Sequence, residues 1–180
     1  DVEAGAVPLL VQLLREGGTD YAKGYAAGAL AHLAVNVDYT ETIADEGVIP
    51  LLLAQLAEGT DYAKEQSARA LRNLAQNEDL CGPIAAAGAI PLLAQLVICD
   101  NSALKTKGVL ALAQLARRKE IVKTLISGGM LPTFLQLHGD QSAHPQLREA
   151  ASWALNNLGF EKKGGGKWVC DEESLQQALR

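Results

Sequence analysis

The sequence predicts an all-α protein that is built from tandem copies of one helical unit. Three observations lead to this prediction. The hexapeptide GTDYAK occurs at residues 18–23 and again at residues 59–64, 41 positions later. A G-x-x-P tetrapeptide occurs four times, with prolines at 8, 50, 91 and 132, so the intervals are 42, 41 and 41 residues. Alanine and leucine dominate the apolar positions, and aromatic residues make up only 4% of the chain, which is unlike a β-sandwich.

Each G-x-x-P marks the expected passage from a short first helix to a second helix. The glycine can end the first helix in a left-handed conformation. The proline suits the first turn of the second helix, where its missing N–H costs little. These tetrapeptides are GAVP at 5–8, GVIP at 47–50, GAIP at 88–91 and GMLP at 129–132. Four residues before each internal glycine stands an apolar marker, namely Ile43, Ile84 or Leu125.

A loop of varying length is expected between the second and third helices. The distance from each proline to the first leucine of the next A-L-x-x-L segment is 22, 21, 21 and 23 residues. The intervening stretches are rich in Gly, Asp, Asn and Ser, which are typical turn residues. The third helices are therefore expected to start near Thr19 or Asp20, Thr60 or Asp61, Ser102 and Pro145.

The third helix of each unit has a clear helical period. Within residues 62–77, Ala68, Leu71 and Leu74 recur at steps of three, and polar residues fill the positions between them. The matching segments are ALAHL at 29–33, ALRNL at 70–74, ALAQL at 111–115 and ALNNL at 154–158. One such unit cannot bury its apolar side alone, so stacked units should form a continuous core and an extended groove.

The repeats should occupy residues 1–160, with approximate bounds of 1–45, 46–87, 88–128 and 129–160. The first copy begins without most of its short helix, so we expect further repeats or a partner to cover that end. Residues 161–180 are expected to form a linker with the charged, glycine-rich sequence EKKGGGKW and then a small closing helix that starts near Asp171. Partner binding is the alternative role for this tail.

Charge and cysteine content limit the possible environment and partners. The chain has 16 basic and 21 acidic residues, a net charge of −5 and a pI near 5.2, which disfavours nucleic acid as a partner. No apolar run approaches the roughly 18 residues of a membrane span, so no direct membrane insertion is expected. Three scattered cysteines fit a reducing compartment. We expect a soluble intracellular protein, cytoplasmic or nuclear, with an organelle as a further possibility.

No local motif indicates an enzyme, a cofactor or a metal. The GGGK at 164–167 lacks the first glycine and the hydroxyl residue of a phosphate-binding loop. The three histidines have no H-E-x-x-H spacing, and no C-x-x-C pair is present. A G-x-S-x-G nucleophile elbow is also missing from the sequence.

The G-A-[VI]-P start and the A-L-x-N-L-A core resemble armadillo repeats, and this resemblance covers residues 1 to about 160. The period excludes tetratricopeptide and ankyrin repeats, at about 34 and 33 residues, and leaves HEAT repeats as the weaker alternative. The resemblance implies a right-handed α-solenoid with three helices per repeat, followed here by the C-terminal tail helix.

The family's binding mode supplies candidate site residues. In the family, third helices line a concave groove, where an Asn bonds the backbone of an extended peptide and a Trp one turn earlier packs on its side chains. The Asn-equivalent positions here hold His32, Asn73, Gln114 and Asn157. The Trp-equivalent positions hold Gly28, Arg69, Leu110 and Trp153. The repeated Trp ladder of importin-alpha-like proteins is therefore missing.

The expected groove is mildly basic. Basic residues on the same helical face outnumber acidic ones. The basic residues are Arg69, Arg72, Lys107, Arg117 and Arg118, and the acidic residues are Glu65, Glu149 and Glu161. Such a groove favours an acidic or phosphorylated segment, as in beta-catenin-like proteins. The alternative is that these are solvated side chains paired along their own helices, for example Glu65 with Arg69. For Trp153, the alternative to contact with a partner is packing against the C-terminal tail.

These observations favour a non-catalytic scaffold or adaptor that binds an acidic, extended segment of another protein in its groove. Two alternatives stay open. One is a structural subunit of a large assembly, held by its ends and its tail. The other is the armadillo fragment of a larger regulator, such as a membrane adaptor or a ubiquitin ligase.

Overall fold

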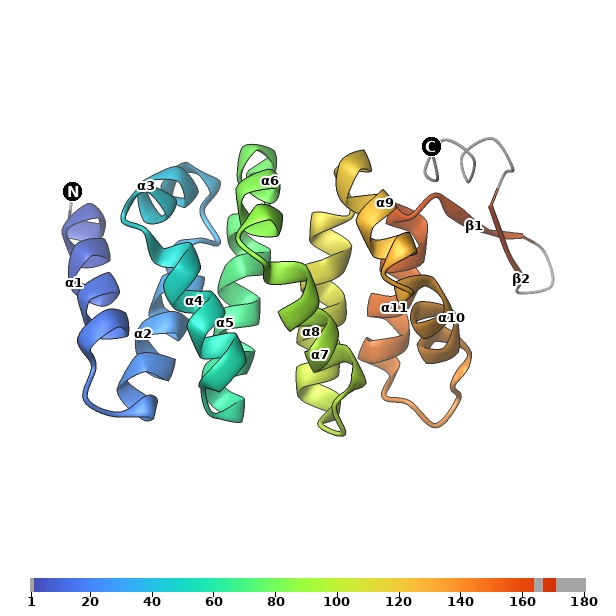
Figure 1. Ribbon diagram of the computed structural model, residues 1–180, viewed down its shortest axis with the longest axis horizontal. Helices are drawn as coiled ribbons and strands as arrows, with labels where there is room; N and C mark the ends of the chain where they lie inside the picture. Colours follow the sequence, from blue (N-terminus) through green and yellow to red (C-terminus); the bar gives the residue numbers. More distant parts are fainter. Residues whose placement is uncertain (1, 164–166, 171–180) are drawn as a thin grey trace.

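The computed structural model describes residues 2–163 and 167–170. Its helices stand in a row, with the helix that begins at Val2 at one end and the strands that end at Cys170 at the other (Figure 1). The helices α2 (Asp20–Leu33), α5 (Asp61–Leu74), α8 (Ser102–Leu115) and α11 (Pro145–Asn157) lie side by side along this row. The helices α3 (Thr40–Asp45), α6 (Glu78–Ala86) and α9 (Lys119–Ser127) follow one edge. This arrangement confirms the predicted all-α solenoid.

Three successive units have the expected three helices. They comprise α3 (Thr40–Asp45), α4 (Val48–Glu58) and α5 (Asp61–Leu74); α6 (Glu78–Ala86), α7 (Ala89–Ile98) and α8 (Ser102–Leu115); and α9 (Lys119–Ser127), α10 (Met130–Gly139) and α11 (Pro145–Asn157). The first unit contains α1 (Val2–Glu16) and α2 (Asp20–Leu33), and the short 3-10 helix η1 (Val37–Tyr39) connects it to α3.

The G-x-x-P turns have the predicted geometry in these three units. Gly47, Gly88 and Gly129 precede α4, α7 and α10, with φ of 75°, 96° and 76°. Such left-handed angles are strained for residues with a Cβ, which explains why glycine stands there. In each case the proline is the third residue of the following helix, within its first turn.

The first copy of this turn differs from the prediction. The helix α1 runs from Val2 to Glu16 and contains Pro8, so GAVP at 5–8 does not mark a helix boundary. Gly5 is helical because the residues before it continue the same helix instead of packing as a separate one. The cost is one missing backbone hydrogen bond at Pro8.

Side-chain caps fix the start of the third helices. The Oγ1 of Thr19 accepts a hydrogen bond from the Ala22 N–H, and Thr60 caps α5 in the same way. The helix α8 starts at Ser102 as predicted, but the side chain that caps it is that of Asn101 and not that of Ser102. The Oδ1 of Asn101 accepts hydrogen bonds from two backbone N–H groups, while Ser102 is already the first helical residue.

The core follows the repeat markers. Leu30, Leu71, Leu112 and Leu155 of the four third helices are all buried, as are Ile43, Ile84 and Leu125 of the first helices. These residues belong to one continuous apolar cluster that runs through the stack. Within the described residues no single helix is both long and apolar enough to span a bilayer, and α6 with α7 reaches that length only across an 83° bend.

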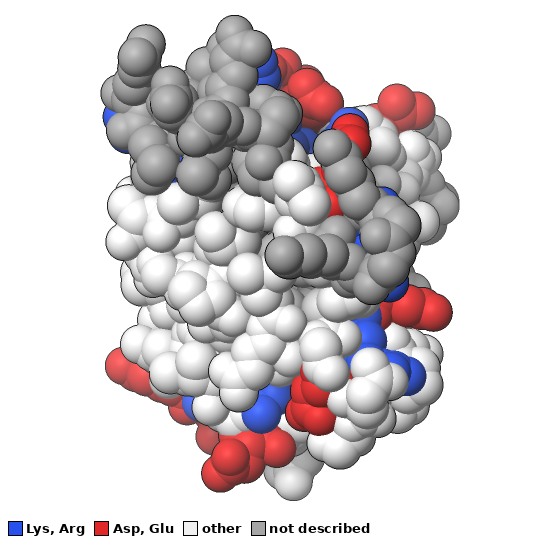
Figure 2. Space-filling view, turned by 90° about the vertical axis from the view of Figure 1, so that its right-hand side faces the viewer, with Lys and Arg blue, Asp and Glu red and all other residues white. Residues whose placement is uncertain are grey.

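The C-terminal end differs from the predicted linker. The strands β1 (Phe160–Lys163) and β2 (Lys167–Cys170) form an antiparallel hairpin, with Lys162 opposite Trp168. The hairpin is anchored because Phe160 is buried and Trp168 packs against the core, edge to face with the His138 ring at 5.2 Å. Figure 2 shows this end of the stack as a largely uncharged surface with charged residues towards its edges. The predicted closing helix falls in 171–180, outside the described residues.

Candidate partner-binding face

The candidate site is the third-helix face, defined here as the surface formed by α2, α5, α8 and α11. Eight candidate residues lie on these helices, namely His32, Arg69, Arg72, Asn73, Lys107, Gln114, Trp153 and Asn157. Arg117 follows the end of α8 by two residues. Because the helices are adjacent in the row (Figure 1), side chains from successive repeats come together on this face.

Two asparagines join a third helix to the one before it. The Nδ2 of Asn73 donates to the carbonyl oxygen of Ala31 at 2.8 Å, and the Nδ2 of Asn157 donates to that of Ala113 at 2.8 Å. Both acceptors lie in the last turn of a helix, where carbonyl groups have no intrahelical partner. The amides therefore satisfy groups that would otherwise be unpaired within the stack.

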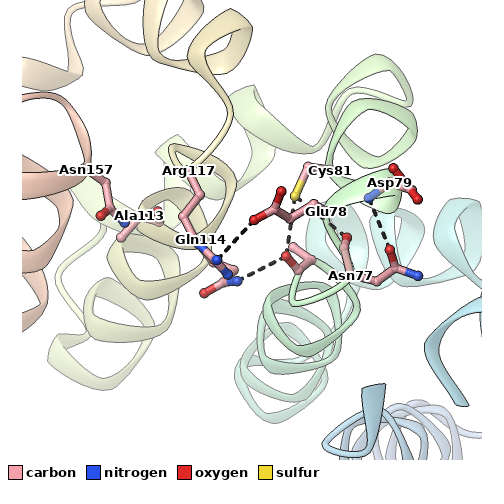
Figure 3. Close-up of polar contacts among 9 residues, drawn as sticks. Asn77, Glu78, Asp79, Cys81, Ala113, Gln114, Arg117 and Asn157 are labelled. Atoms are coloured by element: carbon pink, nitrogen blue, oxygen red, sulfur yellow. Dashed lines mark hydrogen bonds and ion pairs between the residues drawn. The ribbon is translucent and has the colours of Figure 1, made fainter. Parts of the chain in front are cut away.

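Gln114 makes an equivalent contact between α8 and the end of α5 (Figure 3). Its Nε2 donates to the Ala75 carbonyl at 3.0 Å, which also accepts the Cys81 thiol at 3.3 Å. Burial raises the pKa of that thiol. Asn73 and Gln114 are each only 5% exposed. The role of these amides in binding a partner's backbone thus stays a prediction, while their role between repeats is visible.

His32 occupies the corresponding position in the first repeat. It is exposed, and its Nδ1 lies 3.4 Å from a terminal nitrogen of Arg69 on the neighbouring α5. A guanidinium group only donates hydrogen bonds, so the imidazole nitrogen is the acceptor. This contact positions Arg69 on the third-helix face.

Arg72 makes a contact that passes over a whole repeat. Its guanidinium carbon lies 5.9 Å from the centroid of the Trp153 ring, so α5 meets α11 across α8. Repeats of a solenoid usually contact only their neighbours. Burial lowers the pKa of Arg72, and the nearby charge of Arg69 lowers it further.

Two other basic residues have carboxylate partners, on α5 and at the start of α6 respectively. The Nζ of Lys107 lies 3.3 Å from Glu65, and Arg117 lies 3.1 Å from Glu78. The suggested pair between Glu65 and Arg69 is therefore wrong, because Glu65 binds Lys107 on α8. Among the described residues, no carboxylate lies within ion-pair distance of Arg69 or Arg72.

Two adjoining cavities hollow this face. A cavity of about 450 Å³ lies between α8 and α11 and is lined by Thr106, Lys107, Leu110, Gln146, Glu149, Ala150 and Trp153. A second cavity of about 330 Å³ shares three of these residues and adds Glu65, Ser102, Ala103 and His144. Both volumes suit a few side chains of a bound segment.

Thr106 and Gln146 line both cavities and were not among the predicted site residues. The sequence contained a signal for Thr106, because it lies one turn before Leu110 on the same helical face. Gln146 had a similar signal, because it lies two turns before Trp153 on the same face of α11. In the part of the chain that the structure describes, no three His, Cys, Asp or Glu residues are grouped to hold a metal ion.

Comparison with known proteins identifies the repeat. Residues 36–76 match the family model of the armadillo/beta-catenin-like repeat. A designed armadillo repeat protein in complex with the peptide (KR)4 is similar over 98% of this chain and 70% of its own, with 24% sequence identity and a TM-score of 0.83. The chain therefore has the armadillo-repeat fold, and residues 36–76 match the family's repeat in sequence.

Further solved structures share this architecture. A second designed armadillo repeat protein has 23% identity and a TM-score of 0.83, with 98% of this chain and 71% of that chain covered. Computationally designed armadillo repeat proteins for modular peptide recognition give 24% identity and a TM-score of 0.77, with 87% and 66% covered. A search of curated proteins finds no significant match.

The chain differs from the expected family pattern on the third-helix face. Of the four Trp-equivalent positions only Trp153 holds tryptophan, and its ring contacts Arg72. Packing of Trp153 against the tail at 171–180 involves residues outside the described part. The described face is therefore a cationic and aromatic surface between the second and fourth repeats.

Proposed function

We propose that the chain is a non-catalytic scaffold whose third-helix face binds an extended, acidic segment of another protein. One observation supports this most strongly. Arg69 and Arg72 project next to each other without a carboxylate among the described residues, whereas Lys107 and Arg117 each have one. An acidic side chain from a partner would supply the missing counter-charge through bidentate hydrogen bonds.

The adjoining cavities support an extended ligand. Both lie between α8 and α11, and the second also reaches Glu65 on α5, so side chains of an extended segment that crossed these helices could enter them. Helices pack about 8–10 Å apart and an extended chain rises about 3.3 Å per residue, so roughly three residues would span each repeat. About nine residues would cross three repeats.

The ligand proposed here differs in charge from the basic peptide (KR)4 that is in complex with the designed armadillo repeat protein. A basic peptide would approach Arg69 and Arg72 and be repelled. The proposed partner segment is therefore acidic, whereas the peptide of the designed protein is basic, although the two proteins share a fold.

The proposal is tested by selecting ligands from a random library of 12-residue peptides on the immobilised full chain. We expect the enriched peptides to be acidic and to lose at least about tenfold in affinity when Arg69→Glu and Arg72→Glu are combined, a change of more than 1.4 kcal/mol. Fluorescence of Trp153, in a Trp168→Phe background, reports binding.

A matched control carries the same change of charge elsewhere. Lys119→Glu with Lys123→Glu alters two exposed positions on α9, off the third-helix face, and should retain wild-type affinity. Selection of basic peptides, or equal affinity of both double variants, would rule out the acidic-segment proposal.

A second candidate is a structural subunit held by its N-terminal end. The side chains of Leu9 and Leu13 on α1 are 68% and 42% exposed beside a shallow cavity. Exposed apolar patches often mark contacts with other proteins. If this candidate is correct, Leu9→Ser with Leu13→Ser should abolish assembly, while Arg69→Glu with Arg72→Glu leaves assembly intact.

A further inference from the structure

We propose that Tyr21, Tyr25 and Tyr62 form a docking surface for a proline-rich segment of a partner protein. This tyrosine surface is separate from the arginine pair of the proposed function. Tyr62 precedes Arg69 by seven residues and Arg72 by ten on α5, so the two sites lie roughly 10–15 Å apart along the helix. The inference therefore goes beyond the acidic-segment function and does not depend on it.

The three tyrosines are exposed and come from two successive repeats. Tyr21 and Tyr25 lie on α2 and are 67% and 64% exposed, and Tyr62 lies on α5 and is 38% exposed. Tyr21 and Tyr25 are four positions apart, so they share a face of α2. The rings of Tyr25 and Tyr62 meet at a centroid distance of 5.3 Å and an interplanar angle of 58°. Such an exposed aromatic cluster is typical of a contact surface for another protein, where tyrosine is enriched.

A glycine inside α2 gives the Tyr62 ring its place. Gly24 is buried in the helix, and a Cβ added there would lie only 2.9 Å from Cδ1 of Tyr62. Glycine within a helix is less stable than alanine, but here it lets the ring lie directly against the backbone of the neighbouring helix. Tyr62 is thus held in position before a partner arrives, which reduces the entropy lost on binding.

The charged groups near the tyrosine surface are already paired or face elsewhere. Asp61 accepts a hydrogen bond from Nδ2 of Asn101 at 2.9 Å, and Glu65 pairs with Lys107 at 3.3 Å. In both copies of GTDYAK the aspartate stands one residue before the tyrosine and the lysine two residues after it. Residues at these spacings do not face each other on a helix. An uncharged segment therefore matches this surface better than an acidic or a basic one.

The hydroxyl groups of the tyrosine surface are available to a ligand. Within the described part of the chain, none of the three makes a hydrogen bond. A polyproline II segment has no internal hydrogen bonds, so its backbone carbonyl groups are free acceptors, and its prolines bring no N–H that would need a partner. Tyrosine O–H groups can donate to these carbonyls while the aromatic faces pack against the proline rings.

The spacing of the helices also fits this conformation. The helices α2 and α5 are neighbours in the row (Figure 1), and packed helices lie about 8–10 Å apart. Polyproline II has three residues per turn and a rise of about 3.1 Å per residue, so prolines three positions apart lie on one side at a distance of about 9 Å. A P-x-x-P segment that crosses the two helices would place one proline at Tyr25 and the other at Tyr62.

The test compares three pools of fluorescently labelled 12-residue peptides by anisotropy with the full chain. The central residues are P-x-x-P, P-x-P or A-x-x-A, and all other positions are degenerate. We expect the P-x-x-P pool to bind at least about fivefold more tightly than the A-x-x-A pool. The P-x-P pool should lose most of this gain, because its two prolines point to different sides of the polyproline II helix.

Variants at exposed positions separate the tyrosine surface from the rest of the molecule. Tyr21→Ser with Tyr25→Ser should abolish the preference for P-x-x-P, whereas Tyr25→Phe keeps the ring and should reduce the preference only by about twofold. Val35→Ser with Val37→Ser is the matched control. These valines are also exposed, at 56% and 46%, but lie outside the tyrosine surface, so the preference should be retained.

Each outcome decides the inference. Equal binding of the P-x-x-P and A-x-x-A pools, or a preference that survives Tyr21→Ser with Tyr25→Ser, would overturn it. Arg69→Glu with Arg72→Glu should keep the preference for P-x-x-P while losing affinity for acidic peptides, so either proposal can fail without the other, and loss of the proline preference in this variant would contradict a separate surface. Self-association of the chain in sedimentation experiments, if the double tyrosine variant abolished it, would assign the surface to a second copy and also overturn the inference.

Discussion

Asn73 stabilises the stack, although the family resemblance predicted that the side chain at this position binds a partner. Its amide donates to the Ala31 carbonyl of the preceding repeat at 2.8 Å, and it is 5% exposed. A buried carbonyl that loses its only donor costs more than an average hydrogen bond contributes.

Asn73→Ala should therefore lower the free energy of unfolding by about 1–3 kcal/mol, because the Ala31 carbonyl is left unpaired in a buried place. Urea denaturation measures this loss. Asn156→Ala on α11 is the control, since Asn156 is exposed and its truncation should change stability by less than about 0.5 kcal/mol. Similar losses in both variants would contradict the inter-repeat role of Asn73.

The repeat register placed Asn73, Gln114 and Asn157 at corresponding positions of their third helices but did not identify the groups that they contact. Sequence spacing indicates which side chains share a helical face, yet it does not show whether an amide faces solvent or the previous helix. The same limit applies to Arg72 and Trp153, which lie 81 positions apart in the sequence and meet because the stack brings α5 and α11 together across α8.

Left-handed turns separate several helices of this protein, and their backbone geometry explains why glycine occupies these positions. Gly88 has a φ of 96° between α6 and α7, while Gly82 lies inside α6. An added Cβ at either position would meet no atom within 4 Å. The two sites therefore differ in backbone conformation and not in available space.

Gly88→Ala should destabilise the protein by about 1–2 kcal/mol, because a Cβ disfavours the left-handed conformation. Gly82→Ala should have a smaller effect, because the better helix propensity of alanine is offset by the steric restriction on a residue that precedes Pro83. Thermal unfolding of both variants gives the comparison. A destabilising effect of the same size at Gly82 would show that the left-handed turn is not the cause.

Elements that local chemistry dictates were predicted from the sequence, whereas elements that depend on tertiary packing were not. The three turns at Gly47, Gly88 and Gly129 were predicted because local chemistry dictates them. At Gly5 the same tetrapeptide lies inside a helix, since a glycine permits a turn without enforcing it. The hairpin at Phe160–Lys163 and Lys167–Cys170 was missed, because its stability depends on packing against the last repeat and not on local pattern.

The whole molecule consists of units that are stabilised by their neighbours, so stability should vary along the row. The helices α5 and α8 have a repeat on each side, while α1 is covered on one side only and exposes Leu9 and Leu13. A unit with one neighbour lacks part of the interface energy available to an interior unit.

Amide hydrogen exchange should therefore be slowest in α5 and α8 and faster by about tenfold or more in α1. The expected order follows from the number of packed neighbours, and mass spectrometry of peptides from each helix measures it. Uniform protection across all helices would indicate a single cooperative unit and contradict this description.

The three left-handed glycines also affect how such a chain can change in length. Gly47, Gly88 and Gly129 stand 41 residues apart and turn the backbone through nearly the same angles. Joining Gly47 directly to Ala89 would remove one complete unit and still leave a corner of the same geometry. The protein can thus be lengthened or shortened by whole modules through gene duplication or loss, and the two identical copies of GTDYAK are what such a duplication would leave behind.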